Sequence, residues 1–85
     1  MVTLNDFVEV PHSCGKDYKS YQIRGTNILL NENSTLKKGK NGVYRYKPSG
    51  LFTYSQDGMS CGNYAYDYCF GPTEKAIELY IKLFG

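Results

Sequence analysis

Tyrosines recur at every second position in the second half of the chain, at positions 44 and 46 and again at 64, 66 and 68. Phe52 and Tyr54 repeat this spacing between the two sets. Because alternate side chains of an extended chain share a face, the period predicts strands over residues 43–47, 51–55 and 63–69. The intervening Pro48-Ser49-Gly50 and Gln56-Asp57-Gly58 supply a fixed φ and permissive glycines, so they predict turns between antiparallel strands.

The first part of the chain predicts shorter strands. Residues 7–10 are β-prone and stop at Pro11, which cannot continue a central strand. Residues 18–23 and 26–30 are further strand candidates, and Arg24-Gly25 between them is typical of a tight hairpin. Residues 31–42 are almost all polar or glycine, with Leu36 alone suited to burial, and they predict an exposed loop.

A helix is predicted over residues 73–84. Pro72 suits a first helical position, Thr73 suits an N-cap, and Glu74 complements the positive end of the helix dipole. The apolar stripe at i, i+3, i+4 and i+7 offsets comprises Ile77, Tyr80, Ile81 and Phe84, widened by Ala76, Leu79 and Leu83. Since ~12 helical residues are marginally stable alone, this helix must pack on the sheet. We therefore expect residues 1–85 to form one α+β domain, an antiparallel, tyrosine-rich sheet packed against one C-terminal helix.

Charge and hydropathy exclude several classes of protein. Ten basic and eight acidic residues give a formal charge of +2, which indicates neither a histone-like cation nor an acidic DNA mimic. No apolar run approaches the ~20 residues of a membrane span, and no signal peptide is evident, so we expect a cytoplasmic protein, in the host cytoplasm if phage-encoded. Three cysteines make a disulfide framework improbable and predict free thiols.

Catalytic and metal-binding patterns are weak. His12 and Cys14 form the only local nucleophile and base pair, without a phosphate loop, a nucleophile elbow or paired carboxylates, so we expect no enzyme and no cofactor. One histidine and three cysteines add up to a Cys3His ligand set, but their spacing lacks the short C-x2–4-C knuckle of structural zinc sites. Small buried thiols are therefore favoured over a metal site at His12, Cys14, Cys61 and Cys69.

Basic residues gather in one segment. Half of the chain's basic side chains fall within eleven residues, and no acidic residue occurs between Glu32 and Asp57. The predicted strand places Arg45 and Lys47 on one face, with Tyr44 and Tyr46 on the other. This cluster suits contacts with phosphates, but an edge strand protected from aggregation by its charge is the favoured interpretation. Its members are Lys37, Lys38, Lys40, Arg45 and Lys47.

Residues 42–84 resemble the AP2-type DNA-binding domain, a three-stranded sheet backed by one helix. The run GVYRYKPSG and the later FGPTEKAIELY carry the resemblance, and it implies a three-stranded sheet whose first strand contacts DNA through basic residues. The chain departs from the family because it has no tryptophan and no basic residue in its second predicted strand. The residues that match in type and order are Gly42, Val43, Tyr44, Arg45, Gly50, Phe70, Thr73, Glu74 and Ala76.

Nine tyrosines in 85 residues are more than a small core requires. Tyrosine is enriched at protein interfaces, and one short helix cannot cover both tyrosine sets, so at least one set should reach the surface. The leading hypothesis is a non-enzymatic protein-binding protein, similar as a class to small phage and mobile-element inhibitors that occlude a host enzyme or a nucleic-acid-processing or defence complex. The alternative is a double-stranded DNA-binding module that uses residues 37–47. The candidate protein-binding residues are Tyr44, Tyr46, Tyr64, Tyr66 and Tyr68.

Overall fold

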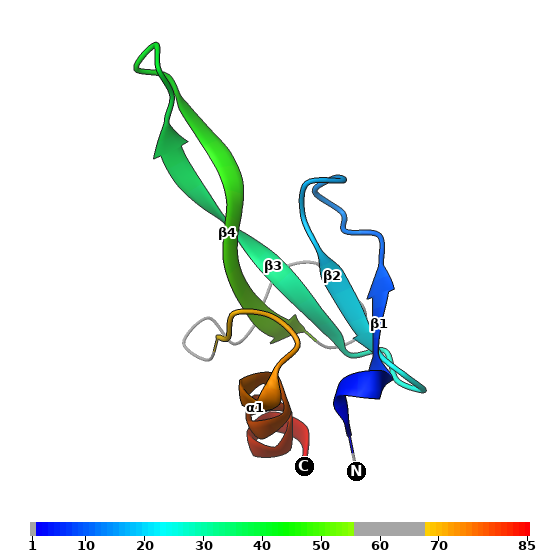
Figure 1. Cartoon of the computed structure of the whole chain (residues 1–85). Coiled ribbons are helices and arrows are strands. Elements are labelled where there is room, and N and C mark those ends of the chain that lie inside the picture. The colour runs from blue at the N-terminus through cyan, green and yellow to red at the C-terminus, as the bar shows by residue number, and fades with distance from the viewer. Residues whose placement is uncertain (1, 56–67) are drawn as a thin grey trace.

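One antiparallel sheet and one C-terminal helix make up the fold, as seen in a computed structural model that describes residues 2–55 and 68–85 (Figure 1). A 3₁₀ turn at Leu4–Asp6 precedes the sheet, whose strands follow the order β1-β2-β3-β4 with every neighbouring pair antiparallel. The predicted α+β class is therefore confirmed. The elements are β1 (Phe7–Val10), β2 (Ser20–Ile23), β3 (Leu29–Lys38), β4 (Tyr44–Ser55) and α1 (Glu74–Phe84).

The strands differ greatly in length, and this difference shapes the molecule. β1 and β2 have four residues each, whereas β3 has ten and β4 has twelve. The strand pairing of β2 with β3 ends at Ser20 and Asn31, beyond which β3 and β4 continue as a two-stranded ribbon. This ribbon projects from the rest of the molecule (Figure 1). The whole molecule, ribbon included, measures 48 × 22 × 20 Å. We call residues 34–48 the arm and the remainder the body.

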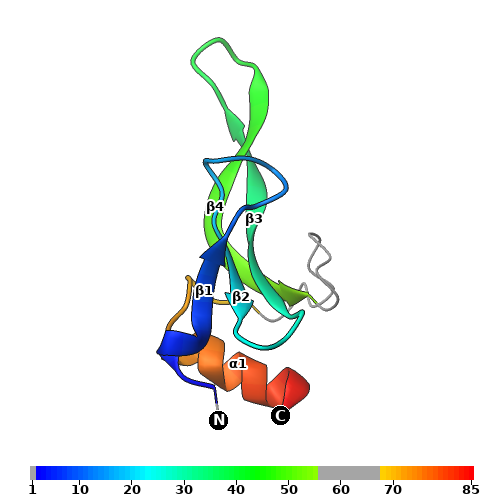
Figure 2. The ribbon, with the colours of Figure 1, turned by 90° about the vertical axis from the view of Figure 1, so that its right-hand side faces the viewer.

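The core lies where α1 packs on the base of the sheet, at the end of the molecule away from the arm (Figures 1 and 2). Tyr54 is fully buried there, and its hydroxyl donates a hydrogen bond to the Ala76 carbonyl oxygen at 2.7 Å. The Tyr54 ring meets Tyr80 and Phe84 edge-on, which is a favourable aromatic geometry. One side chain of β4 thus joins the sheet to the helix. The buried apolar cluster comprises Ile23, Leu30, Phe52, Tyr54, Cys69, Ala76 and Leu79.

A buried polar row crosses three strands beside this core. The Ser20 hydroxyl of β2 donates to the Asn31 side-chain oxygen of β3, and the Asn31 amide donates to the Ser55 hydroxyl of β4 at 3.0 Å. Burying polar groups is tolerated when they are hydrogen-bonded to one another. Within the described residues, every buried side-chain nitrogen and oxygen has a partner, so this row specifies the strand register without leaving an unsatisfied group.

Two predicted boundaries in the first half of the chain are wrong. Residues 31–38, expected in a loop over 31–42, belong to β3, because β4 supplies hydrogen-bond partners along their whole length. A polar sequence does not exclude a strand when both faces of the ribbon lie in solvent. The strand expected over 26–30 begins at Leu29, since the Thr26 hydroxyl bonds the Ile23 carbonyl and closes a turn there. The strand expected over 18–23 is shorter, and the 7–10 strand agrees with β1.

The predicted turn at Pro48-Ser49-Gly50 is a bulge inside one continuous strand. The strands expected over 43–47 and 51–55 are both parts of β4, which keeps its pairing with β3 on either side of the bulge. Residues 49–51 lie opposite the single residue Asn33, and Gly50 adopts a φ of 81° that other residues rarely take. The glycine therefore absorbs extra chain length instead of reversing the chain. The strand expected over 63–69 lies mostly outside the described residues, although Cys69 forms a single bridge with Phe52.

The predicted helix over 73–84 agrees with α1, whose N-cap is Thr73, but its inward face is rotated from the expected one. Ala76 and Leu79 are buried, whereas Ile81, assigned to the inward stripe, is 48% exposed. The small Ala76 side chain lets the helix backbone approach Tyr54 closely enough for the hydrogen bond described above. That contact sets the rotation, so the packed stripe is Ala76, Leu79, Tyr80, Leu83 and Phe84.

The Tyr54 hydroxyl gives a first testable prediction. Burial, with smaller effects from Cys69 and Tyr80, raises the pKa of Tyr54 well above its ordinary range, and burial also raises the pKa of Cys69. The folded state resists ionisation of Tyr54, so the contribution of its hydroxyl to the free energy of unfolding is complete below pH ~10. At higher pH the free energy of unfolding declines by up to about 1.4 kcal/mol per pH unit. Tyr54→Phe should lower the free energy of unfolding by about 1 kcal/mol at pH 7 and make the alkaline decline shallower.

Urea unfolding between pH 7 and pH 11.5 measures both effects. Tyr46→Phe is the matched control, since the Tyr46 ring is exposed, and it should behave as the wild type. An alkaline decline in Tyr54→Phe as steep as in the wild type would contradict the assignment.

Candidate binding surface

The arm has an apolar face made by cross-strand pairs. In the antiparallel register Leu36 lies opposite Tyr46, and Lys38 lies opposite Tyr44. Directly opposed residues of an antiparallel pair project from the same face. Tyr46 is 73% exposed and Tyr44 is 59% exposed, so these rings stand in solvent instead of packing on the core. We call this set, Leu36, Tyr44, Tyr46 and Pro48, the aromatic face.

The opposite face of the arm is basic. Lys37 lies opposite Arg45, and Thr35 lies opposite Lys47. These residues alternate along each strand with those of the aromatic face, so they project from the other side. The prediction that Arg45 and Lys47 lie on the other side from Tyr44 and Tyr46 is therefore confirmed. We call Lys37, Arg45 and Lys47 the basic face. Lys38, opposite Tyr44, lies at the edge of the aromatic face, and Lys40 lies in the turn at the tip.

The arm concentrates charge of one sign. It carries five of the ten basic residues of the chain and no acidic residue, whereas the other five basic and all eight acidic residues lie elsewhere. The formal charge is thus +5 on the arm and −3 on the rest of the chain, although the whole chain carries only +2. Since all five cations are exposed, the arm presents a local positive field that the net charge conceals.

Glu32 fixes the root of the arm. One of its carboxylate oxygens accepts the Lys19 N–H at 3.0 Å, just before β2, and the other accepts the Gly50 N–H at 2.8 Å in the bulge of β4. Carboxylates make stronger hydrogen bonds to backbone donors than neutral acceptors do. A single side chain of β3 therefore ties the segments on both sides of it, at the level where the arm leaves the body.

His12, in the β1–β2 loop, also forms a hydrogen bond to β3 at the root of the arm. Its Nδ1 accepts the Cys14 N–H at 2.9 Å, so the hydrogen of the neutral ring lies on Nε2, which donates to the Glu32 carbonyl oxygen at 3.0 Å. In the bulge, the Ser49 hydroxyl donates to the Asn33 carbonyl oxygen at 2.6 Å. These bonds satisfy the backbone around an irregular pairing and give the arm a defined direction.

Three of the five predicted protein-binding tyrosines lie in the part of the chain that the structure describes. Tyr44 and Tyr46 lie together on the arm, while Tyr68 is half exposed on the body, and Tyr64 and Tyr66 lie outside the described residues. Leu36, the one residue of the predicted loop suited to burial, is exposed on the aromatic face of the arm. The position of Leu36 on the aromatic face follows from its pairing with Tyr46. The polar sequence around Leu36 does not indicate that pairing.

Three of the residues weighed for catalysis or metal binding, His12, Cys14 and Cys69, lie in the part of the chain that the structure describes. Cys14 reaches His12 through its backbone N–H, and the buried Cys69 thiol donates to the Gly71 carbonyl oxygen at 3.3 Å. Cys61 lies outside the described residues. Across residues 2–55 and 68–85, no group of three or more His, Cys, Asp or Glu side chains is arranged to hold a metal ion.

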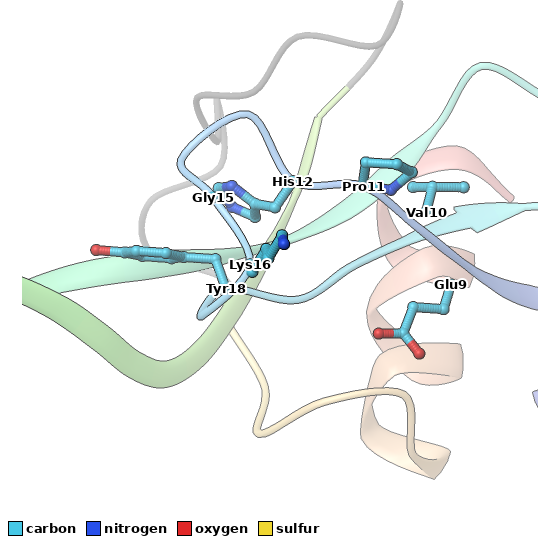
Figure 3. A pocket seen from close by; sticks show the side chains of 7 residues that line it. All are labelled: Glu9, Val10, Pro11, His12, Gly15, Lys16 and Tyr18. Atoms are coloured by element: carbon cyan, nitrogen blue, oxygen red, sulfur yellow. The ribbon is translucent and has the colours of Figure 1, made fainter.

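A cavity of about 510 Å³ opens beside the β1–β2 loop. The His12 and Tyr18 rings lie 5.0 Å apart between their centroids, whereas Glu9 points away from both (Figure 3). Ligand sites generally direct a few polar groups at one point, and the polar groups of this cavity diverge. The cavity is lined by Glu9, Val10, Pro11, His12, Gly15, Lys16 and Tyr18.

Comparison with protein-family models, with curated proteins and with solved structures found no match for this chain. In the part of the chain that the structure describes, no helix combines the length and the apolar character needed to cross a membrane. The arm with its two chemically distinct faces is therefore the candidate site on the strength of its own geometry.

The carboxylate at the root of the arm can be tested by an isosteric change. In Glu32→Gln the amide oxygen can accept one backbone N–H, but the amide nitrogen cannot accept the other, so one donor loses its partner. We expect a loss of about 1–3 kcal/mol in the free energy of unfolding, measured with urea, and faster hydrogen exchange at Gly50. Glu9→Gln, a change at an exposed carboxylate of β1, should alter stability by less than ~0.5 kcal/mol. Equal effects of the two changes would show that Glu32 does not hold the arm.

Proposed function

We propose that this chain is a non-enzymatic binding protein whose aromatic face docks onto a protein partner. The observation that carries the proposal is the exposure of Leu36, Tyr44 and Tyr46 together on a projecting ribbon. Tyrosine contributes strongly at interfaces because its large ring becomes ordered at low entropic cost and its hydroxyl can still form a hydrogen bond. A side chain held on paired strands has already lost much of the backbone freedom that binding would otherwise remove.

The shape of the arm supports insertion into a partner. A two-stranded ribbon is narrow, and it extends beyond β1 and β2 without another described element against its flanks (Figures 1 and 2). We propose that the arm enters a cleft of the partner and blocks it, which is the manner of action of small inhibitors of host or defence enzymes. Such an inhibitor needs no catalytic residue of its own.

Capture from lysate of the native host tests this proposal. Tyr46→Ser removes the most exposed ring of the aromatic face, and Val8→Ser removes an exposed apolar side chain from β1 on the body. A partner identified by mass spectrometry should be captured by the wild type and by Val8→Ser, and at least about tenfold less by Tyr46→Ser. Circular dichroism should show that both variants keep the wild-type fold. Equal capture by all three proteins would exclude the aromatic face as the interface.

Double-stranded DNA is a second candidate partner, favoured by the basic face. A two-stranded ribbon fits the major groove, and Lys37, Arg45 and Lys47 can contact phosphates from one face. Binding of single strands generally combines cations with stacked aromatic rings in one groove. Here the rings lie on the face opposite the basic face, so the arrangement suits a duplex, whose phosphates are outermost.

Matched charge removal tests the DNA candidate. Arg45→Gln with Lys47→Gln, and Lys16→Gln with Lys19→Gln, remove the same charge from the arm and from the body respectively. Fluorescence anisotropy with a random 20-base-pair duplex at low salt should show about tenfold weaker binding only for the arm variant, with a salt slope smaller by up to about 2. Absence of duplex binding, or equal weakening by both changes, would eliminate this candidate.

A further inference from the structure

The outer side of α1 carries a strip of alternating acidic and apolar residues. Glu74, Ile77, Glu78 and Ile81 have i, i+3, i+4 and i+7 spacing, which places them on one face of the helix. The packed stripe that includes Ala76 and Leu79 lies on the opposite side of the same helix. Both glutamates and Ile81 are exposed, and Ile77 is partly exposed. We call these four residues the helix strip.

The helix strip and the aromatic face of the arm are complementary. The strip carries Glu74 and Glu78 beside its isoleucines, with Lys75 and Lys82 elsewhere on the exposed side of α1. The aromatic face carries Lys38 opposite Tyr44, and Lys40 lies in the turn at the tip of the arm. Ion pairs at the rim of an apolar contact add specificity to the burial of the apolar groups. The formal charge of the described residues acts in the same direction, with +5 on the arm and −1 on the described residues elsewhere.

The two surfaces of one molecule lie too far apart to meet. The arm and α1 occupy opposite ends of the 48-Å long axis, with the body of the sheet between them (Figures 1 and 2). In two copies aligned antiparallel, however, the arm of each copy lies beside the helix of the other. A twofold axis perpendicular to the long axis generates both contacts at once and closes the assembly.

We propose that two copies of this chain form an antiparallel dimer, with the aromatic face of each arm packed on the helix strip of the partner. The dimer covers the exposed rings of both arms and brings oppositely charged regions together. Because it occupies the surface that a protein partner would use, dimerisation regulates access to the aromatic face. The dimer itself does not depend on the proposed function, and it can be tested on the purified protein alone.

A reciprocal charge exchange provides the sharpest test. One variant carries Lys38→Glu and Lys40→Glu, and the other carries Glu74→Lys and Glu78→Lys, so that each alone opposes like charges at both contacts. Sedimentation velocity should show a dimer for the wild type and monomers for each variant at the same concentration. An equimolar mixture of the two variants should return to the dimer, because each contact in the mixed pair joins opposite charges.

Two further variants separate the proposed dimer from the proposed binding of a protein partner. Ile81→Ser alters the helix strip and leaves the arm intact, so it should dissociate the dimer while retaining or increasing capture of a partner protein. Glu9→Lys with Lys16→Glu exchanges charges on the body and should leave the dimer unchanged. A wild-type protein that remains monomeric at about 200 µM, far above a micromolar dissociation constant, would overturn the dimer. Failure of the mixture to restore association would overturn the arm-to-helix contact.

Discussion

Continuous pairing between β3 and β4 is the interaction on which the rest of this structure depends. It begins in the core, where Leu30 lies opposite Tyr54, and it ends near the tip, where Lys38 lies opposite Tyr44. Because side chains alternate along both strands, this one ladder sets which residues enter the core and which stand on each face of the arm. A shift of the register by one residue would place Tyr44 and Tyr46 on the same side as Lys37 and so mix the two faces. The hairpin thus joins the core at one end of the molecule to the exposed arm at the other.

The bulge separates the part of β4 that packs in the core from the part that is exposed on the arm. On the body side β4 supplies Phe52 and Tyr54 to the core, and on the arm side it supplies Tyr44 and Tyr46 to solvent. Between them, Gly50 and its neighbours accommodate extra residues opposite Asn33, while the Glu32 carboxylate binds the Gly50 N–H. An irregular pairing without such an acceptor would leave backbone donors unsatisfied and the arm poorly directed. The polar residues at this level are therefore structural elements of the arm.

The distribution of charge explains why composition alone is a poor guide to the partner. A formal charge of +2 suggests little electrostatic character, yet the arm carries +5 and the remainder carries −3. The structure places all five charges of the arm at one end of a 48-Å axis, so the molecule has a strongly positive end. A protein cleft, a DNA duplex and a second copy would each exploit it differently, and each would use a surface that the hairpin creates.

The sequence by itself determined the local elements. Period-two tyrosines and the capped apolar helix were sufficient to predict strands, the helix and the α+β class, and alternation placed Arg45 and Lys47 opposite Tyr44 and Tyr46. Only the tertiary structure decided that residues 31–38 are a strand, since a polar segment forms one when a partner strand satisfies its backbone. It also decided that Pro48-Ser49-Gly50 is a bulge and that Ile81 faces outward, because these depend on register and on the close contact of Tyr54 with Ala76. Long-range pairing of this kind is not encoded in any short stretch of residues, so the arm became visible as a site only in the folded chain.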